Sequence, residues 1–442
     1  MKHTRISAAA AALSLSVLAL SACGIYGTFK SENTKEIEKI EIPSYRDIFT
    51  DADLLSLIDT ALANNLNLRI AHERVRQADA KLTAARLAYL PRIFLGGNPA
   101  VSISNTEHDF SNLSYTLGTA SWEIDIFGRV TNRKRIAKMY GEQMKDFEQA
   151  ARAELIASVA EMYFNLQMLD ASIAASDSAV ANWKNYAAAM RDMKNAGIED
   201  EAAVAQFEGS YYNEKAANRS LRLTRQQAEN AMLLLLGKNG GEIRRRSITA
   251  ARDLDINLEA VRKIDLRALR IRPDVKAAEM QMAQSFYNVN LARANCCPSI
   301  TIDGTLGWAN KSLIYGAVGG LLQPIFNAGE NITQVKVSKS QFEESKLAYA
   351  EALLKAGTEV NDAIAGINAG IDKAEDCGKR VEVMKTALEA TTFKKKLGRG
   401  TYLEILLAQN NLLDAQISDF RNTTDILTNS VKLFHALGGG KQ

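Results

Sequence analysis

Apolar side chains recur every three or four residues along a proline-free stretch in the first half of the chain. The seam consists of Leu155, Val159, Met162, Leu166, Leu169, Ile173, Ser176, Val180, Trp183, Ala187 and Met190. Alternating steps of four and three average about 3.5 residues, which is the period of a coiled coil. Residues 100–272 and those after 324 contain no proline, so both stretches can form long helices. The predicted long helices are Thr131–Ala196, Glu201–Leu236, about Ile332–Leu397, and a return helix ending at Leu437.

Between the predicted helices the pattern changes to alternation of apolar and polar positions. Ile300, Ile302, Leu306 and Trp308 alternate with polar residues and glycine, a period of two that predicts a strand. The expected strands are Ile93–Thr106, Leu113–Phe127, Ile300–Trp308 and Leu313–Phe326, with a longer polar loop at 107–112 in the first pair. The apolar phase flips near Gly118, which predicts a β-bulge or a change of the apolar face.

The order of elements occurs twice. Ala61–Pro91 aligns without a gap on Ala268–Pro298, and farther along Gly197 falls on Gly400. Each copy reads helix, strand pair, long helix, glycine turn and helix, so the chain is an internally duplicated module. The predicted parts are a signal peptide at 1–22, a lipid-anchored extended segment at 23–47, a first repeat at 48–237 (strand pair about 92–127), an inter-repeat equatorial linker at 238–265, and a second repeat at 266–442 (strand pair about 298–326).

Strands of about 10–14 residues suit a tilted membrane barrel, which needs roughly 9–11 residues per strand. Four strands cannot close such a barrel, because the smallest ones have about eight and an open edge in hydrocarbon leaves backbone groups unsatisfied. If these strands enter a membrane, other protomers must complete the sheet. The pattern therefore predicts an oligomer.

The first residues predict export. Lys2 and Arg5 precede an apolar run at Ala8–Leu18, which is too short for a membrane span and is typical of a signal peptide. Leu20-Ser21-Ala22-Cys23 resembles a bacterial lipobox, which implies acylation of Cys23 and an anchor in outer-membrane lipid. Gly24 at the next position implies sorting to the outer membrane. The alternative is an ordinary signal peptide with an incidental cysteine.

Composition narrows the function classes. The formal net charge of +3 falls by two when residues 1–22 are removed, so no charge excess favours nucleic acid. No later segment has 18 consecutive apolar residues, which argues against a helical membrane span. Cys296, Cys297 and Cys377 do not form a disulfide framework, and packing or oxidation of the adjacent pair is favoured over metal binding.

Several motifs together resemble the TolC family of outer-membrane channels, and most closely its lipoprotein branch that serves resistance-nodulation-division pumps. They are Ser121–Arg129, Gln323–Gly329, Arg272–Val275 and Ala436–Gly440. The resemblance implies an all-α periplasmic coiled-coil barrel with transmembrane β-strands. It also implies a homotrimer with a 12-stranded β-barrel and an α-helical tunnel, and as partners a periplasmic adaptor and an inner-membrane transporter.

The resemblance also assigns roles to residues at the helix-hairpin tips. Gly197, Ile198, Gly400 and Thr401 fall where the family docks its adaptor, although each glycine is also explained as a helix C-cap. Glu404 falls on a family carboxylate of the periplasmic gate, but Leu407 stands where a second acid often follows. The further gate candidates are Glu199, Asp200, Glu201 and Arg399, which are nearly as well explained as solvated charges.

The predicted function is passive conduction of drugs or other small molecules through an outer-membrane channel of a tripartite efflux system. The alternatives are an outlet for type I protein secretion or for metal-ion efflux, and, less favoured, a structural or adaptor lipoprotein, which would lack the two-fold repeat. We find no nucleophile motif, phosphate loop or zinc signature, so neither an enzyme nor a cofactor beyond the lipid on Cys23 is expected.

Overall fold

The computed structural model describes residues 26–31, 44–101, 113–248, 266–309, 312–322 and 329–439. Cys23, the predicted signal peptide at 1–22 and most of the linker at 238–265 lie outside these ranges. The chain divides into two compact units, each of which combines segments from both sequence copies. The first comprises Met1–Thr34, Ala71–Glu148 and Asp274–Ala352, and the second Lys35–Ile70, Gln149–Pro273 and Leu353–Gln442.

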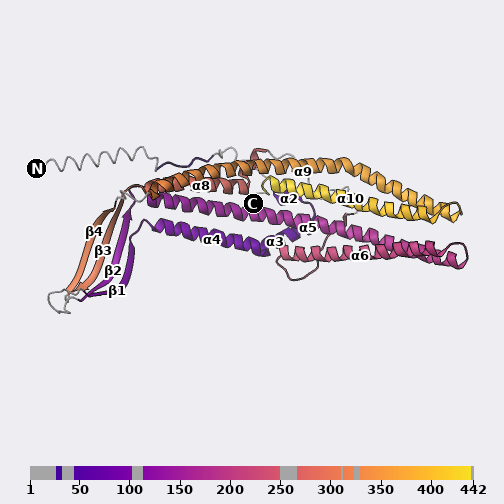
Figure 1. Ribbon diagram of the computed structural model, residues 1–442, viewed down its shortest axis with the longest axis horizontal. Helices are drawn as coiled ribbons and strands as arrows, with labels where there is room; N and C mark the ends of the chain where they lie inside the picture. Colours follow the sequence, from indigo (N-terminus) through magenta and orange to yellow (C-terminus); the bar gives the residue numbers. More distant parts are fainter. Residues whose placement is uncertain are drawn as a thin grey trace. The chain divides into compact units, whose positions relative to one another are not determined.

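The two copies contain helices of equal length (Figure 1). The pairs are α4 (Leu66–Leu87) and α8 (Pro273–Ala294) with 22 residues, α5 (Arg129–Asn195) and α9 (Glu330–Lys396) with 67, and α6 (Glu201–Leu235) and α10 (Tyr402–Ala436) with 35. The predicted long helices are thus confirmed to within two residues. When the two copies are aligned on their helix starts, Arg129 corresponds to Glu330 and Glu201 to Tyr402. Gly197 then corresponds to Gly398, so the predicted alignment of Gly197 on Gly400 was wrong.

Shorter helices precede the matching pairs. They are α2 (Tyr45–Ile48), α3 (Ala52–Asn64) and the 3₁₀ helix η3 (Leu266–Ile271). α2 begins inside the segment predicted to be extended, because Ser44 and Asp47 form a capping box at its start. Among the helices in the described part of the chain, none combines the length and apolar composition needed to cross a membrane.

Four strands form one antiparallel sheet in the first unit, in the order β1-β2-β3-β4. They are β1 (Arg92–Val101), β2 (Leu113–Ile124), β3 (Ser299–Ala309) and β4 (Ser312–Leu322). The register of β2 against β3 shifts between Thr116 and Gly118, which confirms the predicted irregularity. β2 stops at Ile124 rather than at Phe127, because the Asp125 carboxylate accepts hydrogen bonds from the first amides of α5. The ends of the longer predicted strands fall on 102–112 and 323–328, outside the described residues.

The sheet exposes large apolar side chains and has two unpaired edges, β1 and β4, among the described strands. Leu95 is 84% exposed and Tyr315 83%. The exposed apolar residues of the strands also include Ile93, Phe94, Leu117, Trp122, Ile302, Leu306, Trp308, Leu313, Val318, Leu321 and Leu322. Such a surface needs an apolar medium or a protein partner.

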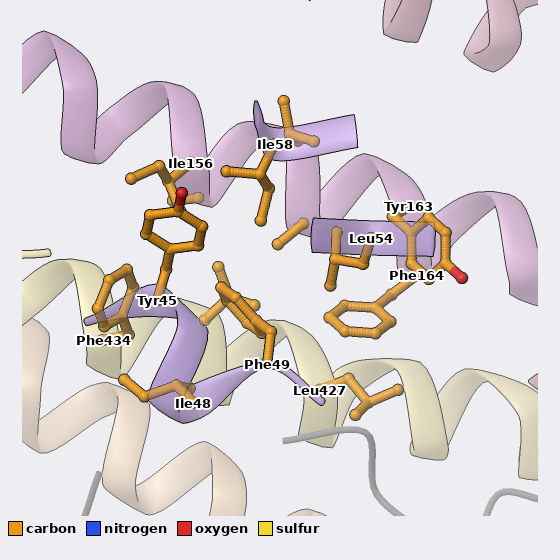
Figure 2. Close-up of a cluster of buried hydrophobic side chains, with 14 of the residues drawn as sticks. Tyr45, Ile48, Phe49, Leu54, Ile58, Ile156, Tyr163, Phe164, Leu427 and Phe434 are labelled. Carbon is orange, nitrogen blue, oxygen red and sulfur yellow. The ribbon is translucent and has the colours of Figure 1, made fainter. Parts of the chain in front are cut away.

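The core of the second unit is built around α2 and α3. Figure 2 shows Phe49 and Leu54 surrounded by buried side chains from α5 and α10. The ring of Phe49 meets that of Phe434 edge-on at 5.9 Å between centroids. The buried hydroxyl of Tyr163 donates to the Asp51 carboxylate at 2.5 Å, and Asp51 also accepts from the Asp53 amide as the N-cap of α3. This core fixes α3, α5 and α10 together.

Arg272, from the Arg272–Val275 motif, lies at the edge of the same core. The side chain is almost fully buried and donates to the Ala436 carbonyl at 2.7 Å and to Glu359 at 2.8 Å. It therefore satisfies a carbonyl at the end of α10 while it pairs with a carboxylate on α9.

Candidate functional site

The second unit carries two helix hairpins, α5–α6 and α9–α10, each with a glycine at its turn (Figure 1). Gly197 has a φ of 73°, and the amides of Gly197 and Ile198 donate to the carbonyls of Lys194 and Met193. Gly398 has a φ of 72°, and its turn makes the same pair of bonds to Lys395 and Lys394. Both turns are Schellman caps. The cap of the second hairpin is therefore Gly398, and Gly400 follows it.

The residues after each glycine begin the return helices. The Asp200 carboxylate accepts from the Ala203 amide at 2.9 Å, and the Thr401 hydroxyl accepts from the Glu404 amide at 3.4 Å. Asp200 and Thr401 are thus the N-caps of α6 and α10. This gives both residues a structural role, which can coexist with the predicted roles at the gate and in docking.

The structure distributes the other gate candidates among three ion pairs. Glu199 lies 3.6 Å from Lys395 and joins the turn of the first hairpin to the second. Glu201 pairs instead with Lys194 in its own hairpin, and Glu404 lies 4.0 Å from Lys394, also in its own hairpin. Arg399 is exposed at the turn. Among the described tip residues, the pair of Glu199 and Lys395 is the one salt bridge between the hairpins.

An aromatic cluster joins the hairpins directly behind this ion pair. The ring of Tyr402 meets Phe207 edge-on at 5.7 Å, and its hydroxyl donates to the sulfur of Met193 at 2.6 Å. The Lys395 ammonium lies 3.7 Å from the centre of the same ring. Burial, and secondarily Glu199, raise the pKa of Tyr402 above its usual range, so the hydroxyl stays protonated and can donate.

Sequence reasoning missed Tyr402, Met193 and Phe207. The apolar seam included Trp183 and Met190, which are buried in the same cluster. A seam along a single helix does not predict which residues of the second hairpin pack against it. The signal that could have found them is the pair of aromatic residues in the first two turns of the return helices, Phe207 in α6 and Tyr402 in α10.

The tips also expose apolar side chains. Ile198 is 65% exposed, and Leu397, Leu403 and Leu407 are each more than half exposed. Apolar residues at this density around two turns are available to a protein partner. Gly197 and Ile198 therefore lie on an accessible surface, as docking requires, although the contact itself stays a prediction.

Metal and disulfide chemistry gain no support in the part of the chain that the structure describes. It holds no group of three or more histidine, cysteine or acidic side chains arranged to bind a metal ion. Cys296, Cys297 and Cys377 are partly buried and form no disulfide.

Comparison with solved structures identifies the class of fold. A crystal structure of CusC, described in connection with transmembrane channel formation, superimposes with a TM-score of 0.82 at 22% identity. The match covers 94% of this chain and all of that one. The paired helix hairpins and the four-stranded sheet are therefore the protomer fold of such channels.

Sequence comparison identifies the family. The profile described as "Outer membrane efflux protein" matches residues 57–238 and 266–439, and the chain belongs to this family. The cation efflux system protein CusC of Escherichia coli O157:H7 is 26% identical over 412 residues, covering 90% of this chain and 88% of CusC. The probable outer membrane lipoprotein SilC of Salmonella typhimurium is 24% identical over 428 residues, covering 93% and 91%. The prediction of an outer-membrane efflux channel is confirmed.

Proposed function

We propose that the chain forms a homotrimeric channel in which three protomers close one 12-stranded β-barrel in the outer membrane, with their helices forming a periplasmic tunnel. The observation that carries this proposal is the sheet with two unpaired edges and exposed apolar side chains. Backbone groups at such edges cannot remain unsatisfied in hydrocarbon, so β1 of one protomer pairs with β4 of the next. Twelve strands lie within the known range for membrane barrels.

The hairpin turns are the docking and gating end of the tunnel. Gly197, Ile198, Gly400 and Thr401 meet a periplasmic adaptor, which in turn connects the channel to an inner-membrane transporter. The exposed Ile198 and Leu397 support a protein contact at this end. The transporter selects and energises the cargo, and the channel conducts it passively.

The resting tip is held by the link between the hairpins. The pair of Glu199 and Lys395, together with the contacts of Tyr402 with Met193 and Phe207, resists separation of the two turns. Glu201, Asp200 and Arg399 supply the surrounding charge, and Glu404 lines the constriction as a ring of three carboxylates. The deeper helices are joined by larger apolar contacts, so the tip is the part that yields on opening.

The N-terminus is anchored by lipid on Cys23. The relative SilC is named a lipoprotein, which supports this assignment. Cys23→Ser is expected to abolish incorporation of labelled palmitate, while the barrel keeps the protein in the membrane fraction. Unchanged labelling would show that Cys23 is not the acylated residue.

Mass measurement of the detergent-purified protein tests the channel proposal. We expect three copies per particle, which in planar bilayers form a pore. A stable monomer would contradict the closure of the barrel by three protomers.

A further inference from the structure

A concentration of positive charge lies where the helices of the first copy meet the sheet. Residues 80–101 and 126–141 contain no aspartate or glutamate, yet they contain eight basic residues. The basic residues are Lys81, Arg86, Arg92, Arg129, Arg133, Lys134, Arg135 and Lys138. Three of them have contacts within the protein: Arg129 pairs with Glu123 at 3.1 Å, Arg135 donates to the Gly27 carbonyl, and the Lys81 ammonium lies 4.8 Å from the centre of the Tyr140 ring.

Four others, Arg86, Arg92, Arg133 and Lys134, form what we call the basic collar. Arg86, Arg92 and Arg133 are exposed and Lys134 is half-buried, and none forms an ion pair with a carboxylate of the described residues. The acids at the end of β2 are engaged elsewhere, because Glu123 is paired with Arg129 and Asp125 caps α5. The charge of the collar is therefore not neutralised by a carboxylate of the described residues.

Tyr89 ties the collar to the sheet. Its hydroxyl is hydrogen-bonded to Thr131 at 2.9 Å, and the Lys134 ammonium lies 5.2 Å from the centre of its ring. Its carbonyl accepts from the Trp122 indole at 2.9 Å. An indole and a tyrosine ring beside an ammonium group are typical of the boundary between hydrocarbon and water.

Apolar side chains continue directly from the collar onto β1. Leu87 and Leu90 are 57% and 58% exposed, and Ile93 and Leu95, which lie on the same face of β1, are 71% and 84% exposed. The basic residues are therefore adjacent to an apolar surface. This arrangement matches a phospholipid, in which a charged phosphate is followed by apolar acyl chains. Arginine and lysine near a membrane surface attract anionic headgroups.

We propose that the basic collar binds the headgroup of an anionic phospholipid, with the acyl chains lying along Leu90, Ile93 and Leu95. The inference rests on the proposed insertion of the sheet into the outer membrane and places the lipid in the leaflet next to the helices. The guanidinium groups of Arg92 and Arg133 suit a phosphate, because they can donate two parallel hydrogen bonds to its oxygens.

The second copy keeps only one of the four collar residues, Arg293 at the position of Arg86, and supplies the matched control. α9 begins with Glu330, where α5 begins with Arg129. Its first turns carry the exposed Lys336 and Lys339, at the positions of Arg135 and Lys138, and have no basic residue at those of Arg133 and Lys134. The lipid site is thus specific to the first copy.

Native mass spectrometry of the delipidated, detergent-solubilised trimer tests the site, with phosphatidylglycerol and phosphatidylethanolamine as separate probes. The wild-type protein should retain phosphatidylglycerol more tightly. Arg133→Gln/Lys134→Gln should weaken phosphatidylglycerol binding on the order of tenfold, since each basic residue near a membrane surface contributes about 1 kcal/mol. Lys336→Gln/Lys339→Gln should leave it unchanged, and Lys134→Arg should retain binding.

Three outcomes would overturn the proposal. They are equal retention of both lipids by the wild type, equal losses in the two double variants, and displacement of phosphatidylglycerol by millimolar inorganic phosphate, which would indicate a site for free phosphate. The mass of the particle reports trimer assembly in the same spectrum. A failure of the lipid site in an intact trimer is therefore distinguishable from a failure of the channel proposal.

Discussion

Glu199 and Lys395 form an ion pair of 3.6 Å that connects the turn of the first hairpin with the last turn of α9. Both side chains are about three-quarters buried, so this pair is screened less than an ordinary surface pair. The same ammonium also lies over the ring of Tyr402. The cation–π contact holds the ammonium within its own hairpin, and the ion pair with Glu199 then joins the two hairpins.

Replacing Lys395 should loosen the tip. Lys395→Gln removes the ion pair between the hairpins, which is worth roughly 1 kcal/mol or less, so the open fraction should rise severalfold. Single-channel recording in planar bilayers should show a higher mean conductance, as should charge reversal at Glu199. Lys194→Gln is the matched control, because Lys194 pairs with Glu201 within one hairpin and should leave the conductance unchanged.

Arg272 should be among the most sensitive positions for stability. Arg272→Ala leaves the Ala436 carbonyl and the Glu359 carboxylate without their donor, and breaking such a pair costs about 3 kcal/mol. The midpoint of thermal unfolding in detergent should fall clearly. Lys355→Ala is the control, because Lys355 is exposed and approaches the same carboxylate only to 4.0 Å. Equal effects of the two substitutions would contradict the role given to Arg272.

Tyr163 should make stability depend on pH in the alkaline range. Burial, and next the hydrogen bond to Asp51, raise the pKa of Tyr163 above the usual value of about 10. Because the folded state holds this proton more tightly, the stabilisation is present below pH ~10 and is lost as the pH rises further.

Tyr163→Phe removes the hydrogen bond, so the unfolding free energy below pH ~10 should drop by about 1 kcal/mol. Its decline above pH ~10 should also be shallower than in the wild type. Unfolding midpoints measured from pH 8 upward check both points. Tyr212→Phe, at an exposed tyrosine, should change neither.

Much of the helical architecture could be predicted because it depends on local patterns. A seam with a 3.5-residue period and a glycine turn predicted the ends of α5 to within two residues, and the internal repeat extended the prediction to α9. The end of β2 could not be predicted in this way. Alternation continues through Ile126, but Asp125 is taken as the cap of α5, a competition that the apolar pattern does not reveal.

The contacts at the hairpin tips also could not be predicted from the sequence pattern. The sequence Gly398-Arg399-Gly400 offers two glycines, and only the backbone conformation shows that Gly398 has the positive φ. Glu199, Asp200 and Glu201 are all gate candidates by sequence, but only Glu199 pairs with the second hairpin, while Asp200 caps α6 and Glu201 pairs within its own hairpin. Which charge pairs with which depends on the rotation of each helix, which sequence periodicity alone does not give.

Glu404 provides the sharpest test of the gate. Its carboxylate lies at the start of α10, 4.0 Å from Lys394, and both side chains are partly exposed. In a trimer, three such carboxylates around the axis would attract cations into the constriction, and three Lys394 ammonium groups would partly offset them. The selectivity of the pore then depends on the balance between these two residues.

The two residues should therefore act in opposite directions. Glu404→Gln should lower the cation-to-anion permeability ratio about twofold or more and weaken block by multivalent cations. Lys394→Gln should raise that ratio, because it leaves the carboxylate without its nearby positive charge. Reversal potentials in a salt gradient measure both variants, with trimer mass as the check on assembly. Wild-type selectivity and block in Glu404→Gln would place Glu404 on a solvated surface and the constriction elsewhere.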